Sequence, residues 1–211
     1  ASLLVPMDLS QKNHLKAYGL AYWSLTQGSN VEWLLNYRGG SFLFDDLDIF
    51  RRRALVMGVT FEEVGPSDVA AIRAEIAQEN MESVLLEKAP RVAIYTPPDK
   101  QPWDDAVTLA LTYSEIPYDK IWDEEVLAGK LSEYDWVHLH HEDFTGQYGK
   151  FYASFHTAAW YQQQQSLYEK LAREAGYSKV SLHKSAVVDA IAEYVRAGGF
   201  LFAMCSATDS F

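Results

Sequence analysis

Short apolar runs alternate along this chain with longer segments in which apolar residues recur every three or four positions. Runs of the first kind predict buried strands, and spacing of the second kind predicts helices. The pattern predicts strands at residues 3–6, 31–37, 59–64, 91–95, 118–122, 135–140 and 200–204. It predicts helices at residues 15–25, 46–57, 66–77, 103–113, 157–175 and 185–196, with Ser67 suited to cap the third of them.

Strands that alternate with helices in this way favour an α/β fold built from parallel βαβ units. The turn-forming residues Lys88-Ala89-Pro90 interrupt the pattern, which then starts again. We therefore expect two units, an N-terminal α/β unit at residues 1–88 and a second α/β unit at residues 89–211.

Composition excludes several classes of partner. The formal net charge is −11, from 29 acidic and 18 basic residues, which argues against nucleic acid and against anionic membrane surfaces. No apolar run approaches the roughly 20 residues of a membrane span. The chain begins Ala1-Ser-Leu-Leu-Val without Met, which fits removal of a signal peptide, so we expect an exported or periplasmic protein.

The only cysteine of the chain, Cys205, follows the last predicted strand. A sharp turn from a strand into a helix exposes the residue at the turn, and the helix N-terminus supplies amide donors there. Such a turn needs small neighbours, and Ala203 and Ala207 lie two residues before and after Cys205. We predict Cys205 as a nucleophile, with Ser206 and Ala207 forming the oxyanion side of the elbow. The alternative is a buried cysteine that packs as a small hydrophobe.

A second group of chemically active side chains ends the strand predicted at 135–140. His138 and His140 lie two positions apart and so share one face of that strand, while His141, Glu142 and Asp143 follow at its tip. In a parallel sheet this end faces the ligand crevice. If the strand neighbours the one before the cysteine, thiol, imidazole and carboxylate groups meet there.

The same run also has a metal interpretation, because metallo-hydrolases use His-x-His-x-Asp-His ligand runs. Here the fifth and sixth positions are Glu142 and Asp143, so two positions depart from that pattern. We therefore assign no metal ligand and no cofactor, and keep a metal-dependent hydrolase as a less favoured alternative.

The second half of the chain resembles the class I glutamine amidotransferase-like superfamily, whose fold is flavodoxin-like. The resemblance covers residues 90–211 and rests on the segments 91–95, 134–140 and 198–205. It implies an elbow cysteine that attacks an amide carbonyl, with a His and a Glu supplied later in the chain. We therefore expect a flavodoxin-like domain cut short after the elbow. The loop after residue 139 reads His-His-Glu-Asp-Phe-Thr-Gly, where the superfamily usually carries Gly-Gly.

The whole chain is similar to a group of exported bacterial proteins that are labelled asparagine synthetase B. The segments that carry this similarity are 4–8, 12–19, 33–42, 140–149 and 204–209. Synthetases of that name use a Ser-Gly-Gly-x-Asp-Ser loop for ATP, which this sequence lacks. The similarity therefore implies a fold and an envelope location, and the label looks wrong for the reaction.

These observations predict a thiol-dependent hydrolase or amidase of the bacterial envelope. Cys205 is the expected nucleophile, and His140 or His141 the expected base, oriented by Glu142 or Asp143. The expected ligand is a small molecule or peptide with an amide bond, and a protein partner in the envelope is compatible with this location. The alternative is a binding or scaffold protein that keeps the fold without catalysis.

Overall fold

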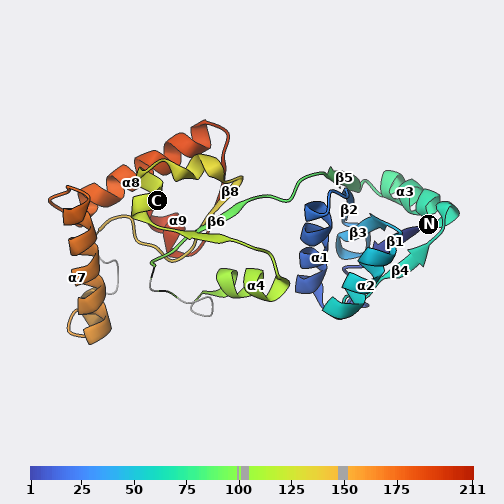
Figure 1. Ribbon diagram of the computed structural model, residues 1–211, viewed down its shortest axis with the longest axis horizontal. Helices are drawn as coiled ribbons and strands as arrows, with labels where there is room; N and C mark the ends of the chain where they lie inside the picture. Colours follow the sequence, from blue (N-terminus) through green and yellow to red (C-terminus); the bar gives the residue numbers. More distant parts are fainter. Residues whose placement is uncertain (99, 101–104, 147–151) are drawn as a thin grey trace. The chain divides into compact units, whose positions relative to one another are not determined.

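The computed structural model describes residues 1–98, 100, 105–146 and 152–211, which form two compact units (Figure 1). The first unit comprises Ala1–Ala89 and Pro102–Pro117, and the second comprises Pro90–Gln101 and Tyr118–Phe211. The predicted division was 1–88 and 89–211. The segment around 106–114 groups with the first unit because its helix packs on the first helix of the chain. No helix in the described ranges has the length and apolar character needed to span a bilayer.

The first unit contains a five-stranded sheet in which every neighbouring pair is antiparallel. Its strands are β1 (Ser2–Val5), β2 (Val31–Leu35), β3 (Ser41–Asp45), β4 (Glu62–Val64) and β5 (Glu82–Leu86), in the order β4-β1-β3-β2-β5. The predicted parallel sheet is therefore wrong for this unit. The physical reason lies between β2 and β3, where only residues 36–40 connect the strands, and so short a connection joins antiparallel neighbours.

In the described part of the first unit, helices complete the fold and bury both faces of the sheet. They are α1 (His14–Thr26), α2 (Asp48–Met57), α3 (Pro66–Gln78) and α4 (Ala106–Ser114), with a short 3-10 turn η1 (Tyr37–Gly39) between β2 and β3. Leu3 of β1 packs with residues of α1 and α2, while its neighbour Leu4 packs with residues of α3, as the alternation of side chains along a strand requires. The helix α3 is capped by Gly65 rather than by Ser67, since the Asp68 carboxylate accepts the Gly65 N–H at 2.8 Å.

The second unit holds a four-stranded sheet in which all pairs are parallel, so here the predicted parallel arrangement is confirmed. Its strands are β6 (Val92–Tyr95), β7 (Asp119–Ile121), β8 (Trp136–Leu139) and β9 (Phe200–Ala203), in the order β7-β6-β8-β9. Its helices are α5 (Asp123–Leu127), α6 (Tyr152–Phe155), α7 (Ala159–Glu174), α8 (Val180–Arg196) and α9 (Ser206–Ser210), with a 3-10 turn η3 (Lys130–Glu133).

The core of the second unit lies between its sheet and α8. Val137 and Leu139 of β8 are fully buried with Val187 and Ile191 of α8. A four-residue spacing places such side chains on one face of a helix. This packing fixes β8 and β9 side by side, with Trp136 opposite Phe200 in the register. The carboxyl ends of these two strands carry the residues that the sequence singled out.

Candidate functional site

Cys205 lies on a sharp turn between β9, which ends at Ala203, and α9, which begins at Ser206. Its backbone angles are φ 53° and ψ −137°. A residue with a Cβ rarely adopts this region, and such strained positions concentrate at functional sites. Ala207 is completely buried, so a larger side chain would not fit there. The Cys205 side chain is exposed, and the alternative of a buried structural cysteine is therefore wrong.

Hydrogen bonds hold the end of β8 and the residues that follow it against this elbow. The Met204 N–H donates to the Leu139 carbonyl at 3.0 Å and extends the pairing of β8 with β9 by one step. The Ala207 N–H donates to the His140 carbonyl at 3.1 Å, and the Ser206 hydroxyl donates to the His141 carbonyl at 3.1 Å. The backbones of both histidines are thus held against the residues that directly follow Cys205.

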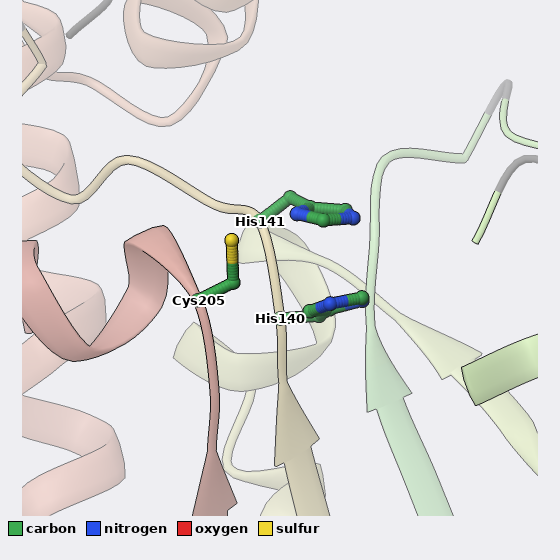
Figure 2. A group of neighbouring side chains, drawn as sticks. All are labelled: His140, His141 and Cys205. Atoms are coloured by element: carbon green, nitrogen blue, oxygen red, sulfur yellow. The ribbon is translucent and has the colours of Figure 1, made fainter. Parts of the chain in front are cut away.

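This arrangement brings Cys205, His140 and His141 together (Figure 2). The thiol sulfur and one ring nitrogen of each histidine all lie within 4.8 Å of one another. The two imidazole rings stack with centroids 3.5 Å apart. His140 is buried, whereas His141 and Cys205 are exposed, so the group combines one fixed side chain with two that solvent and ligands reach.

The two predicted carboxylates shape the loop that carries these imidazoles. Glu142 accepts the His140 backbone N–H at 3.0 Å. Asp143 accepts both the N–H of Thr145, at 2.9 Å, and its hydroxyl, at 2.6 Å. Such short-range bonds from a carboxylate to nearby backbone fix the course of a turn. Both residues therefore lie where the sequence placed them, at the tip of β8, and their carboxylates bond to the loop.

The amide groups of the elbow differ from the expectation. Both Ser206 and Ala207 were predicted as oxyanion donors, but the Ala207 N–H is already donated to His140. The Ser206 N–H opens helix α9 and therefore has no intrahelical acceptor. Of the two predicted donors, Ser206 is therefore the one whose amide is not used by the first turn of α9.

His138 lies inside the sheet rather than in this group. Its side chain is 1% exposed, and its ring stacks on that of Phe202, with centroids 5.5 Å apart. Within the described ranges, the histidine and cysteine side chains that gather closely enough to share an ion are His140, His141 and Cys205. His138 therefore does not belong to the group of side chains that could share an ion.

A buried polar group that sequence analysis missed lies on the other side of the same sheet end. The Lys184 ammonium donates to both carboxylate oxygens of Asp123 and to the Tyr95 hydroxyl, each at 2.8 Å. It also lies 3.9 Å from the centre of the Trp122 ring, a favourable distance for a cation above an aromatic face. Burial lowers the pKa of Lys184, against the opposing effect of Asp123, and raises the pKa of Tyr95 well above its usual value. The signal was present in the sequence, because Lys184 occupies a core position in the apolar spacing of α8.

Tyr95 connects this buried group with the histidine loop. Its ring stacks on Trp122 at 4.4 Å and on Phe144 at 5.3 Å, measured between centroids. Phe144 follows Asp143 directly and is buried. Beside the group, a groove of about 620 Å³ is lined by residues that include Trp122, Tyr177 and His183. The polar network thus contacts the histidine loop through the stacking of Tyr95 on Phe144, and it borders this groove.

Comparison of the chain with protein-family models, with curated proteins and with solved structures finds no match.

Proposed function

We propose that the second unit carries a thiol-dependent hydrolase site with Cys205 as the nucleophile. The observation that carries this proposal is the strained elbow, which presents an exposed thiol within 4.8 Å of two imidazole nitrogens. A thiol is activated by an adjacent base, and the contacts of such pairs are often loose before substrate binds. The strand order β7-β6-β8-β9 supports a flavodoxin-like fold, since it matches the order 2-1-3-4 of that class.

The geometry supports cleavage of an amide bond in two steps. An imidazole of His140 or His141 takes the thiol proton, and the sulfur attacks the carbonyl carbon. The Ser206 N–H then stabilises the negative oxygen that forms. The tetrahedral species expels the amine, which takes the proton back from the imidazolium and leaves a thioester. Water attacks the thioester and restores the thiol, with release of the carboxylic acid.

The substrate class follows from the same features. Cys205 and His141 are exposed, so a small molecule or a peptide with an amide group can reach the thiol directly. The resemblance to exported bacterial proteins supports a location in the cell envelope. The likeness of the elbow to that of the amidotransferase-like superfamily supports amide chemistry. In this site, however, the imidazoles come from the loop after β8.

One observation favours a second candidate, a binding protein on the same fold. The Ala207 N–H is donated to the His140 carbonyl, so one of the two expected oxyanion donors is engaged. Removing an oxyanion-hole donor lowers kcat by about 10²–10³-fold in enzymes that depend on it. A protein of this kind would recognise its ligand at the elbow without turnover.

The rate of Cys205 alkylation by iodoacetamide separates the two candidates. For a hydrolase we expect alkylation at pH 6 to be at least about tenfold faster than that of free cysteine, because an adjacent imidazole accepts the thiol proton as the sulfur attacks. H141A should remove much of that advantage. The matched control is H156A, which changes an exposed histidine of the same unit and should leave the rate unchanged. A rate equal to that of free cysteine, with no effect of H141A, would favour the binding protein.

A further inference from the structure

We propose that Cys205, His140 and His141 bind one zinc-type divalent ion. This inference goes beyond the hydrolase proposal and does not depend on it. The three side chains come from two neighbouring strand ends, and their ligand atoms lie within 4.8 Å of one another. The sequence pattern suggested a different ligand run, His138 and His140 with the following acids, and it combined the thiol with the imidazoles only as a nucleophile with its base.

The distances are close to those that a tetrahedral ion requires. Zinc binds histidine nitrogen at about 2.0–2.1 Å and cysteine sulfur at about 2.3 Å, which places neighbouring ligand atoms roughly 3.3–3.5 Å apart. The observed upper limit of 4.8 Å therefore calls for shifts of about 1 Å or slightly more. Cys205 and His141 are exposed and have room to make them, while the buried His140 provides a fixed point.

The backbone that carries the three ligands is already ordered. The Ala207 N–H holds the His140 carbonyl and the Ser206 hydroxyl holds the His141 carbonyl, each at 3.1 Å. Folding has therefore already met the entropic cost of bringing the two separate segments together. Exposed side chains that lie close together on mobile loops lack such a fixed backbone.

The ligand types select the class of ion. Thiolate and imidazole suit zinc and copper, whereas Mg²⁺ and Ca²⁺ require several oxygen ligands. Three protein ligands leave a fourth position for water, as in catalytic zinc sites. The exposure of Cys205 and His141 allows solvent to reach that position. A bound ion would hold the Cys205 thiolate and so prevent its attack on a carbonyl, which makes zinc an inhibitor of the proposed hydrolase.

Titration of the whole chain with Co²⁺, as a coloured substitute for Zn²⁺, tests this site. We expect one equivalent to produce a thiolate-to-cobalt charge-transfer band together with the visible bands of tetrahedral cobalt. Zn²⁺ should displace both. C205S should abolish the charge-transfer band. H141A should weaken binding by more than the roughly 10- to 100-fold that loss of an outer-shell partner costs. H156A, the matched control, should bind like the native chain.

Both C205S and H141A change exposed side chains, and circular dichroism with thermal melting would establish that they fold. Pale octahedral cobalt without a thiolate band would overturn the proposal, and so would equal binding by C205S and the native chain. The hydrolase proposal is judged separately, by alkylation of the metal-free protein. A chain that binds cobalt through Cys205 but reacts slowly when metal-free would refute the hydrolase alone, and the reverse result would refute the ion site alone.

Discussion

The strained backbone at Cys205 makes a quantitative prediction about stability. Glycine adopts φ 53°, ψ −137° with much less strain than a residue that has a Cβ, and strain of this kind costs about 1–3 kcal/mol. Glycine also loses more chain entropy on folding, at roughly 0.5–1 kcal/mol relative to alanine. C205G should therefore be more stable than C205A by up to about 2.5 kcal/mol, and by roughly 1 kcal/mol at the middle of both ranges. The thiol is absent from both variants, so the difference isolates the backbone.

The matched control is A203G, two residues earlier in β9. Glycine in a regular strand carries the entropic cost and here also loses the contact of the Ala203 methyl group with the core, so this variant should be less stable than the native chain by at least about 0.5–1 kcal/mol. Because the chain has two units, the measurement must report on the second one. Urea unfolding followed by hydrogen exchange in peptides that cover β8 and β9 provides this. A C205G variant no more stable than C205A would refute strain at the elbow, and with it the main support for a nucleophile.

Three further predictions concern the surrounding structure. K184M should lower the free energy of unfolding by about 3–5 kcal/mol, because it leaves the buried Asp123 carboxylate without its cation. The double variant K184M/D123L should regain most of that free energy, as measured by urea unfolding. G19A should lower the melting temperature, although alanine usually favours a helix by about 1 kcal/mol, because its Cβ would overlap the Ser114 carbonyl of α4. Burial lowers the pKa of His183, so its ring should stay neutral by NMR below pH 6.5. The folded state then binds fewer protons than the unfolded state, and His183 makes stability fall as pH drops below about 6.5.

Most elements were predictable because their apolar spacing is regular. The helices at 14–26 and 48–57 and the strands of the second unit lie within two residues of the predicted ranges, whereas the helix at 180–196 begins five residues before its predicted start. Two strands of the first unit, Ser41–Asp45 and Glu82–Leu86, were missed. The strand Ser41–Asp45 follows a tight turn at residues 36–40. The two glycines of this turn indicate the end of a strand but do not show that a second strand follows. Without that second strand, the hairpin and its antiparallel pairing cannot be predicted.

The site was predictable in position but only partly in detail. Small residues on both sides of Cys205 indicated the turn, and the end of β8 indicated where the histidines lie. The bond from the Ala207 N–H to the His140 carbonyl depends on tertiary packing, and no local pattern contains it. The buried Lys184 was missed because the predicted helix begins at residue 185, one position after it, and because its partner Asp123 lies 61 positions away.

The pairing of β8 with β9 also makes the reactivity of Cys205 depend on whether these two strands stay together. Leu139 lies opposite Ala203 in this pairing, and the next residues on each strand lead directly to His140 and Cys205. If β9 detaches while the rest of the unit stays folded, the thiol loses both imidazoles at once. The alkylation rate of Cys205 would then report how often this end of the sheet opens. Local unfolding of the second unit could therefore be measured without an attached probe.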